Sequence, residues 1–346
     1  MKQIDAIASE VLAKQHIAGM EIGIGRAGKV LYARGYGLRD RVRDLPVTAQ
    51  TIFPVGSITK QFTAASVMLL VQRGRVNLDD RVSRYVPDAP HGSEITVRQL
   101  LDQTSGLPDY LEDKKLLAAI MSGTVGAQSV ESLVALVYGK PLHFKPGAKW
   151  EYSNTNYALA GSIVARESGM PFAQFLKSAI FKPQQLNASQ YLRLSVPSGP
   201  DVTRGYTATK QGFTLLPDFS MDWGNAAGAI ASNARDLIRW DEAYFSGNVI
   251  SEANVRVSTT PPAHIVMPAT SKSRANNLGL GYAFGWVQGR AEGRQVIWHN
   301  GGLPGARAMN AVFPSDSLEI IVLTNVTDAS PEDTAMKIAR VIYDSP

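Results

Sequence analysis

The chain of 346 residues contains no cysteine. Disulfide bonds, thiol catalysis and zinc sites built on thiolates are therefore excluded, and either an oxidising or a reducing compartment is tolerated. The chain also lacks any run of eighteen or more apolar residues, which excludes a membrane-spanning helix. Its first residues lack the apolar segment of a signal peptide, so we expect either an internal protein or one whose export signal is missing from this sequence.

Charge of one sign is not concentrated anywhere in the sequence. The 35 Lys and Arg residues exceed the 30 Asp and Glu residues by a net charge of +5, and Lys114-Lys115 is the only lysine pair. Without a dense basic run, a nucleic-acid partner is not expected. With 45% apolar and 19% charged residues, the chain can bury a full core as one large domain or two intimate ones.

Two common hydrolase signatures are missing as well. No Gly-x-Ser-x-Gly sequence occurs, which disfavours an α/β-hydrolase. No His-Glu-x-x-His sequence occurs and the five histidines are far apart in the chain, which disfavours a metal hydrolase. We therefore predict no metal ligands and no cofactor.

One glycine-rich segment, Gly23 to Lys29, matches the dinucleotide-binding pattern and most of a phosphate-loop pattern. Both patterns need a helix directly after the glycines, so that its N–H groups point at the phosphate. The following residues, Val30 to Arg34, have the composition of a returning strand. We therefore interpret the segment as the turn of a β-hairpin.

Hydrophobic periodicity predicts an α+β fold. The expected elements are a helix at residues 2–15, strands at 21–26 and 30–37, mostly helices over 86–190, an irregular stretch at 191–222, a helix at 232–243, strands at 282–288, 295–298, 308–313 and 319–323, and a helix at 332–343. The simplest assembly is an antiparallel β-sheet flanked by helices, built from residues 1–85 and 223–346, with a mainly helical lobe at 86–222. The active site is expected in the cleft between them.

Ser57 and Lys60 begin a predicted buried helix over residues 58–72, after Pro54 and Gly56. Residues three apart on a helix are neighbours, so the Lys60 amine is expected beside the Ser57 hydroxyl. A lysine that is desolvated loses proton affinity and can activate a serine nucleophile. Taken alone, the pair is better explained as a helix cap and a solvated lysine.

Two further segments could complete this pair. Tyr152 and Asn154, two residues apart in a loop before a predicted helix, could serve as a proton-transfer group and as a hydrogen-bond donor to a substrate carbonyl. His299, Asn300, Gly301 and Gly302 end a predicted strand, where the two glycines allow a ligand to approach the backbone. The alternatives are an ordinary loop and a hairpin turn with an exposed histidine.

The motifs Ser57-x-x-Lys60, Tyr152-x-Asn154 and His299-x-Gly301, in this order, resemble those of the serine β-lactamase and penicillin-binding protein superfamily. The Tyr-x-Asn motif makes the chain similar to the branch with class C β-lactamases, family VIII carboxylesterases, DD-carboxypeptidases and D-amino-acid peptidases. The resemblance extends over nearly the whole length, and it implies a fold with a sheet, a helical lobe and a cleft between them.

The resemblance also implies a role for each motif residue. Ser57 would attack a carbonyl to form an acyl-enzyme, and Lys60 and Tyr152 would share the proton transfers, with the general base left open. The backbone N–H groups of Ser57 and Gly302 would form the oxyanion hole. Asn154 would hold a substrate carbonyl, and the remaining substrate-binding residues would lie along the acyl chain: His299, Asn300 and Gly301.

Two positions depart from the pattern. His299 stands where β-lactamases of this branch carry Lys, and histidine is often uncharged at neutral pH, so Arg294 or Arg307 would have to supply a charge for a substrate carboxylate. Gln103 stands where relatives often have His before Thr-Ser-Gly, and the sequence gives it no role.

The leading hypothesis is a serine hydrolase acting through an acyl-enzyme as a carboxylesterase on short-chain esters, with weak β-lactamase activity. The alternatives are a DD-carboxypeptidase or D-amino-acid peptidase or amidase, and a non-catalytic penicillin-binding-like scaffold. The expected partner is a small-molecule ester, amide or β-lactam substrate. The sequence does not give the oligomeric state.

Overall fold

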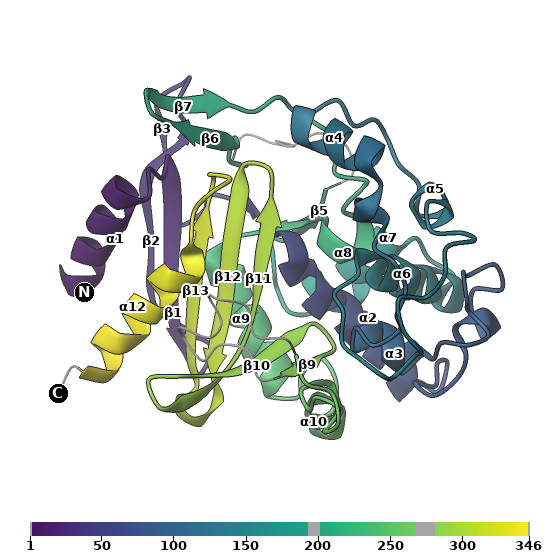
Figure 1. Ribbon diagram of the computed structural model, residues 1–346. Coiled ribbons are helices and arrows are strands. Elements are labelled where there is room, and N and C mark those ends of the chain that lie inside the picture. The colour runs from purple at the N-terminus through teal and green to yellow at the C-terminus, as the bar shows by residue number, and fades with distance from the viewer. Residues whose placement is uncertain (1, 193–200, 268–280, 345–346) are drawn as a thin grey trace.

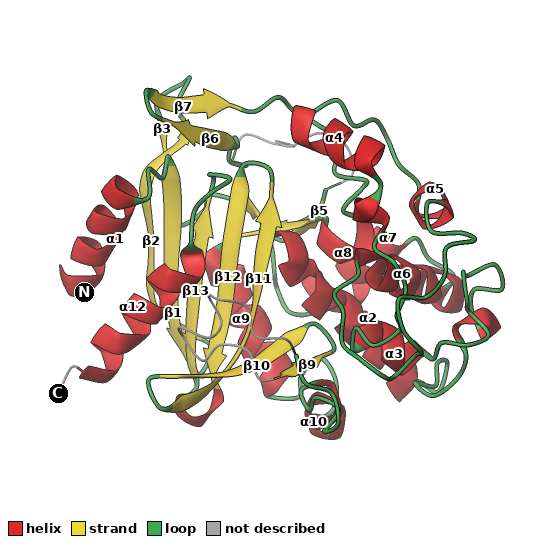
Figure 2. Ribbon diagram, in the orientation of Figure 1, coloured by secondary structure: helices red, strands yellow, loops and turns green. Residues whose placement is uncertain are grey.

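The computed structural model describes residues 2–192, 201–267 and 281–344. Within them, an eight-stranded antiparallel sheet stands beside a group of helices (Figures 1 and 2), which confirms the predicted α+β class. The strands in spatial order are β3 (Leu45–Pro46), β2 (Lys29–Asp40), β1 (Gly19–Arg26), β13 (Leu318–Thr324), β12 (Ala306–Phe313), β11 (Arg294–Leu303), β10 (Trp286–Ala291) and β9 (Gly281–Ala283). Strands from both ends of the chain thus meet at the centre, where β1 pairs with β13.

Helices cover both faces of this sheet. The terminal helices α1 (Lys2–Lys14) and α12 (Pro331–Asp344) contact each other, and α12 packs on β12 and β13. On the other face, α9 (Ala234–Phe245) packs on β1 and β13. Both α9 and α12 carry an apolar stripe, so burying it against the sheet stabilises the layers.

The helical part of the molecule stands beside β11 (Figure 1). Its helices are α2 (Thr59–Gln72), α3 (Val97–Leu101), α4 (Lys114–Ser122), α5 (Val130–Ala135), α6 (Asn154–Ser168), α7 (Phe172–Leu176) and α8 (Asn225–Gly228), with α10 (Glu252–Ser258) below α9. Helix α2 packs against α6 and α8. The domain boundaries at residues 85–86 and 222–223 stay a prediction.

The glycine-rich segment at Gly23 to Lys29 forms the β1–β2 hairpin, as predicted. Ala27 and Gly28 both have positive φ, 49° and 72°, which is the backbone of the tight turn that joins two neighbouring strands. No helix follows the glycines within this hairpin, so the phosphate-loop pattern has no structural counterpart here.

Two predictions of secondary structure were wrong in detail. The single strand expected at 282–288 is two strands, β9 and β10, separated by a turn in which Phe284 and Gly285 have φ of 45° and 83°. The stretch 191–222, expected to be irregular, contains a hairpin of β6 (Tyr206–Thr209) and β7 (Gly212–Leu215). Residues 193–200 of that stretch lie outside the described residues. The strands β6 and β7 escaped prediction because each has only four residues and its apolar residues alternate weakly.

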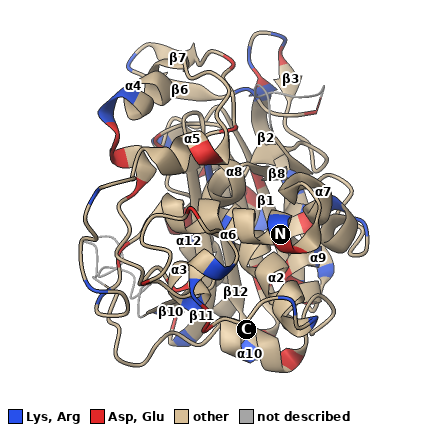
Figure 3. Ribbon diagram, turned by 90° about the vertical axis from the view of Figure 1, so that its right-hand side faces the viewer, with Lys and Arg blue, Asp and Glu red and all other residues tan. Residues whose placement is uncertain are grey.

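Shorter strands complete the description: β4 (Phe53–Pro54) and β5 (Gln190–Tyr191) both pair with β8 (Ile230–Ser232). No helix among the described residues is long and apolar enough to cross a membrane. In the view of Figure 3, basic and acidic residues are interspersed over the helices and loops. The expectation that nucleic acid is not a partner stays a prediction.

Candidate active site

Ser57 lies in a short 3₁₀ turn, η1 (Gly56–Ile58), which leads directly into α2. The sequence predicted the first turn of an α-helix there, whereas the structure has a 3₁₀ turn that begins at Gly56, with φ of 53°. A β-carbon on Gly56 would lie 2.8 Å from the backbone nitrogen of Gly302. Glycine is therefore required at position 56, because a side chain there would collide with the backbone of β11.

Lys60 lies one turn further along α2, and its side chain is fully buried. Its Nζ lies 3.1 Å from Ser57 Oγ, 2.8 Å from Asn154 Oδ1 and 2.8 Å from the Ala227 carbonyl oxygen. Because nearly every residue of α2 is buried, water cannot solvate the ammonium. Burial lowers the pKa of Lys60 to about 7, against the opposing negative charge of Asp109. A substantial fraction of Lys60 is thus uncharged at neutral pH.

Tyr152 approaches Ser57 from the loop before α6. Its hydroxyl donates a hydrogen bond to Ser57 Oγ at 2.7 Å, and its ring centre lies 4.6 Å from Lys60 Nζ. Burial of the hydroxyl raises the pKa of Tyr152 well above its usual range. Tyr152 is therefore a neutral phenol at neutral pH and can donate a proton, whereas Lys60 is the stronger candidate for the base.

Asn154 is the first residue of α6, two residues earlier than the predicted helix start. Its backbone N–H and its side-chain Nδ2 both donate to Asp109 Oδ2, at 3.1 and 2.8 Å. Asp109 was not among the predicted site residues. The available signal was the capping-box pattern of Asp109 and Glu112, which predicts a helix start but not a contact with a catalytic loop.

Gln103 is the second residue whose role the sequence did not give. Its side-chain Oε1 accepts hydrogen bonds from Ser153 N at 3.0 Å and from Asn156 Nδ2 at 2.6 Å. Its carbonyl oxygen accepts from Glu151 N at 3.0 Å. These three bonds hold both sides of Tyr152, so Gln103 fixes the loop from which the phenol reaches Ser57.

His299 is buried, with 2% of its surface exposed, so it is not the exposed turn residue of the alternative interpretation. Its Nδ1 lies 2.6 Å from the carbonyl oxygen of Asn300, which can only accept, so Nδ1 carries the proton. Its Nε2 lies 3.3 Å from the Tyr282 hydroxyl. Burial, with the neighbouring Lys60 charge, lowers the pKa of His299 to about 3, and the imidazole is neutral.

The end of β11 forms one wall of the site. Pairing with β10 stops at Trp298, so the residues of β11 beyond it have no strand partner on that side among the described residues. A β-carbon on Gly301 would lie 1.8 Å from the Val55 carbonyl oxygen, so only glycine fits between β11 and the Ser57 turn. Gly302 N lies beside this turn, as an oxyanion hole shared with Ser57 N would require.

Asn300 is not brought to Ser57. Its side chain is exposed and donates to Glu332 Oε1 at 2.6 Å, on the face of β11 opposite to that of His299. A role along the acyl chain would therefore involve its backbone rather than its amide.

Arg294 and Arg307, which were considered as sources of positive charge in place of a lysine at position 299, differ in position. Arg294 lies at the far end of β11, where it pairs with Asp316 at 3.1 Å. Arg307 pairs in register with Gly302, and its guanidinium donates to the carbonyls of Leu303 and Ala306 at 2.8 and 3.0 Å. Only Arg307, of these two, lies beside the proposed oxyanion hole.

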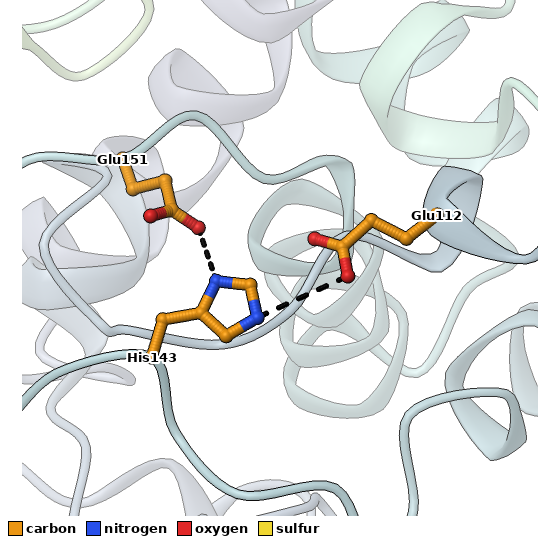
Figure 4. A group of neighbouring side chains, drawn as sticks. All are labelled: Glu112, His143 and Glu151. Carbon is orange, nitrogen blue, oxygen red and sulfur yellow. Dashed lines mark hydrogen bonds and ion pairs between the residues drawn. The ribbon is translucent and has the colours of Figure 1, made fainter.

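A cluster of three side chains, Glu112, His143 and Glu151, lies at the outer edge of the site (Figure 4). His143 Nδ1 contacts Glu151, and its Nε2 lies 3.9 Å from Glu112 Oε2. The three potential donor atoms lie within 4.8 Å of one another, but all three residues are at least partly exposed and the imidazole already faces both carboxylates. The cluster therefore links the Asp109 turn to the Tyr152 loop, and the prediction that the chain holds no metal is left untested.

An aromatic wall borders the same space. The ring centres of Trp150 and Tyr152 are 6.4 Å apart, and those of Trp150 and Tyr282 are 6.0 Å apart. Together with the tilted contact between Tyr152 and His299 at 6.3 Å, they form an apolar surface beside Ser57.

The predicted residues thus fall into three groups. Ser57, Lys60, Tyr152 and Asn154 are joined by direct hydrogen bonds, whereas His299, Gly301 and Gly302 lie against them through ring and backbone contacts. Asn300 points away. Gln103 and Asp109 are additional residues that hold the first group in place.

Known proteins are similar to this chain over nearly its whole length. A family profile described as Beta-lactamase matches residues 4–343. Penicillin-binding protein 4* of Bacillus subtilis is 29% identical over 358 residues, covering 97% of this chain and 76% of that protein. The chain spans 63% of the length of the Staphylococcus aureus relatives named Protein flp.

Two solved structures have the same fold. The octameric penicillin-binding protein homologue from Pyrococcus abyssi superposes with a TM-score of 0.86 at 28% identity, over 99% of this chain and 77% of that one. A D-stereospecific amidohydrolase from a Streptomyces species superposes with a TM-score of 0.82 at 25% identity, over 96% of this chain and 97% of that one.

Proposed function

Because this chain belongs to the Beta-lactamase family, we propose that it is a serine hydrolase that cleaves amide bonds of D-amino acid derivatives. The single observation that carries the proposal is the position of Ser57 Oγ, which lies between Lys60 Nζ at 3.1 Å and the Tyr152 hydroxyl at 2.7 Å. One of these groups is suited to accept a proton near neutral pH and the other to donate one.

Acylation begins with the neutral form of Lys60. Its lone pair accepts the Ser57 proton as Oγ forms a bond with the substrate carbonyl carbon. The C–N bond then breaks, and the leaving nitrogen takes a proton from the Tyr152 hydroxyl, which regains one from the Lys60 ammonium. The products of this half-reaction are an ester on Ser57 and a free amine or ammonia.

Deacylation follows the same route in reverse, with water in place of the amine. The base takes a proton from water, the hydroxide oxygen attacks the ester carbonyl, and Ser57 leaves with a proton restored to Oγ. In both halves the backbone N–H groups of Ser57 and Gly302 would stabilise the oxyanion, a contribution of about 10²–10³ in rate for one such donor.

Two observations support the proposed substrate class, one from a solved structure with the same fold and one from the motif His299-x-Gly301. The D-stereospecific amidohydrolase is 25% identical over nearly its whole length, which favours an amide of D configuration. His299 is neutral, so it cannot anchor a free carboxylate as a lysine would. This difference favours an amidase or aminopeptidase over a DD-carboxypeptidase. The aromatic wall of Trp150 and Tyr282 would suit an apolar substrate side chain.

Short-chain ester hydrolysis, which the sequence analysis ranked first, is now the second candidate. The acyl-enzyme chemistry of Ser57 applies to esters as well, since an alcohol is an easier leaving group than an amine. No relative described above is named for it. The non-catalytic scaffold ranks below both, because a scaffold has no need of the contacts between Ser57, Lys60 and Tyr152.

The test is hydrolysis of D-phenylalaninamide and L-phenylalaninamide, followed by ammonia release, alongside p-nitrophenyl acetate, nitrocefin and a D-alanyl-D-alanine peptide. We expect turnover of the D-amide in preference to the L-amide, and its complete loss in Ser57→Ala. Ser66→Ala removes a buried hydroxyl within α2, which donates to the Phe62 carbonyl oxygen, and should leave activity intact. Undiminished turnover by Ser57→Ala would refute the assignment, and turnover of the ester alone would move esterase activity to first place.

A further inference from the structure

Asp109 begins the 3₁₀ turn η3 (Tyr110–Glu112) and lies beside the first residue of α6. Its Oδ1 accepts a hydrogen bond from Leu111 N at 3.0 Å, as an N-cap does. Its Oδ2 faces the catalytic loop and accepts from both nitrogens of Asn154. One carboxylate therefore caps a turn and holds a residue that touches Lys60.

The Asp109 side chain is oriented by these partners. Oδ2 accepts from two N–H groups and Oδ1 from one, and N–H donors favour the carboxylate over the protonated acid. Burial raises the pKa of Asp109, while the N–H donors of Leu111 and Asn154 and the Lys60 charge act in the opposite direction. The pKa of Asp109 is raised overall, and three N–H groups orient its carboxylate form.

The Asn154 amide can take only one orientation in this setting. Because Asp109 Oδ2 can only accept, the Nδ2 group of Asn154 must face it, and Oδ1 must face Lys60. The second hydrogen of Nδ2 remains available for a substrate carbonyl. If the amide were reversed, its NH₂ group would point at the Lys60 amine.

The orientation matters because a neutral lysine has two N–H donors and one lone pair. Two of the three neighbours of Lys60 Nζ, Asn154 Oδ1 and the Ala227 carbonyl oxygen, are acceptors that cannot donate. They take the two N–H groups, so the lone pair is left for the third neighbour, the Ser57 hydroxyl.

We propose that Asp109 is a positioning residue that fixes the Asn154 amide and thereby directs the lone pair of neutral Lys60 at Ser57. The proposal rests on the function proposed above. When Lys60 is neutral, the Ser57 O–H donates to Nζ, and acylation moves this proton to Nζ as the Oγ–carbon bond forms. With the amide reversed, the lone pair would accept from Asn154 instead, and Ser57 would lose its base.

Asp109 also sets the proton affinity of Lys60. The titratable groups that face Lys60 are Asp109 from η3, Tyr152 from the loop before α6, Tyr157 from α6 and His299 from β11. The two phenols and the imidazole are neutral at neutral pH, so the Asp109 carboxylate is the source of negative charge in this set. Its removal should therefore lower the pH at which Lys60 loses its proton.

An outer brace supports this arrangement. Glu112 Oε1 accepts from the backbone N–H of Asp109 at 3.1 Å, and its Oε2 faces His143. His143 in turn contacts Glu151, the residue before Tyr152 (Figure 4). The turn that carries Asp109 and the loop that carries Tyr152 are thus linked on the solvent side as well.

The experiment compares Asp109→Asn and Asp109→Ser with Asp113→Asn and Asp113→Ser. Asp113 is a matched control, since it caps α4 by accepting from Lys115 N and Leu116 N and no contact joins it to Asn154 in the described structure. Serine keeps a helix cap but is too short to hold Asn154, so Asp109→Ser separates capping from positioning. The readout is the rate at which a fluorophosphonate labels Ser57, measured from pH 5 to 9, with circular dichroism to confirm folding.

Wild type should be labelled with a rate that rises with pH through about 7, following the deprotonation of Lys60. Both Asp109 variants should be labelled at least about 10-fold more slowly, since general-base assistance is worth about 10²–10⁴. Their half-maximal pH should also move downward, and Asp109→Glu, which keeps the charge, should return it toward the wild-type value. The Asp113 variants should show neither change.

A purely structural role would slow labelling without moving the half-maximal pH, so an unchanged midpoint in both Asp109 variants overturns the proposal. A second measurement is a double-mutant cycle with Asn154→Ala, in which Asp109→Ser should add little further loss because it acts through Asn154. Full additivity would likewise overturn it. If wild-type Ser57 is not labelled at all, the proposed hydrolase function fails and the role of Asp109 falls with it. Normal labelling of Asp109→Asn rejects only the role of Asp109.

Discussion

Two clusters of buried polar side chains share helix α2, and they are built differently. Lys60 belongs to the catalytic cluster, in which an amine, a carboxyl group and carbonyl oxygens have defined partners. Its neighbour Gln61 belongs to a second cluster between α2, α9 and the sheet. There, four polar atoms have no partner within the described part of the chain: Gln61 Nε2, Asp241 Oδ2, Asn310 Oδ1 and Glu319 Oε2.

The difference lies in the signs of the charges. Lys60 and Asp109 have opposite charges, so each opposes the effect of burial on the other's pKa. Asp241 and Glu319 are both acids, and burial raises the pKa of both, that of Glu319 to about 7. The first cluster directs a proton between two groups, whereas the second becomes neutral by retaining protons. Substitutions in the first should change turnover, and substitutions in the second should change the pH dependence of stability.

The largest effect is expected from Lys60→Met. Methionine fills similar space but provides no base, so kcat/KM should fall by about 10²–10⁴-fold. Lys14→Met, which removes an exposed lysine that pairs with Glu10, should leave kcat/KM unchanged. Steady-state assays of the D-amide with both variants make the comparison. Retention of most activity by Lys60→Met would transfer the role of base to Tyr152.

The pH profile of the unmodified enzyme provides the next test. If neutral Lys60 is the base, kcat/KM should fall about tenfold for each pH unit below about 7 and level off above it. If the Tyr152 phenolate were the base instead, the rise would continue to much higher pH, because burial raises the pKa of Tyr152. A profile measured from pH 5 to 10 separates the two outcomes.

Gln103→Ala should have an intermediate effect. It removes the acceptor for Ser153 N and Asn156 Nδ2, so the Tyr152 loop loses its anchor, and a displacement near 1 Å costs about 100-fold in rate. Gln99→Ala, which removes the capping-box partner of Thr96 a turn earlier, should cost stability but not rate. Equal rates for the two variants would show that Gln103 does not position the loop.

The sequence predicted the fold class and the order of the main elements, because helix and strand periodicity are local. The structure also brings Ser57, Lys60, Tyr152 and Asn154 together, while their catalytic roles stay predictions. Asp109 and Gln103 were not assigned because their importance depends on which loop they face, and a capping pattern or a glutamine contains no such information. The split of β9 from β10 was missed for a related reason, since the left-handed conformation of Phe284 follows from packing rather than from its own preference.

A small effect on amide turnover is expected from Arg307→Gln. The guanidinium is bound to the Leu303 and Ala306 carbonyls, so an amide without a carboxylate should be hydrolysed within about fivefold of the wild-type rate. The control is Arg294→Gln, at the far end of β11. A large rise in KM for a D-alanyl-D-alanine peptide in Arg307→Gln alone would instead assign Arg307 to a substrate carboxylate and favour the carboxypeptidase alternative.

Glu21→Gln should leave turnover unchanged and alter only stability. Glu21 is fully buried on β1, where Oε2 accepts from Ala234 N at 3.2 Å and Oε1 has no partner among the described residues. Burial raises the pKa of Glu21 from 4.5 to about 8, so between these values the folded protein binds a proton that the unfolded chain releases. The free energy of unfolding of the wild type should therefore fall as pH rises through this window.

Glutamine keeps the acceptor for Ala234 but cannot ionise, so Glu21→Gln should match the wild type near pH 4.5 and exceed it increasingly up to about pH 8. At pH 7 the difference is of the order of 3 kcal/mol, at about 1.4 kcal/mol for each unit of pKa shift. Urea unfolding at several pH values measures it, with the exposed Glu10→Gln as a control that should not gain stability. A constant difference at all pH values would mean that Glu21 is already ionised in the folded protein. Glu21 would then differ from Asp241 and Glu319, the carboxyls beside Gln61, which are inferred to retain their protons.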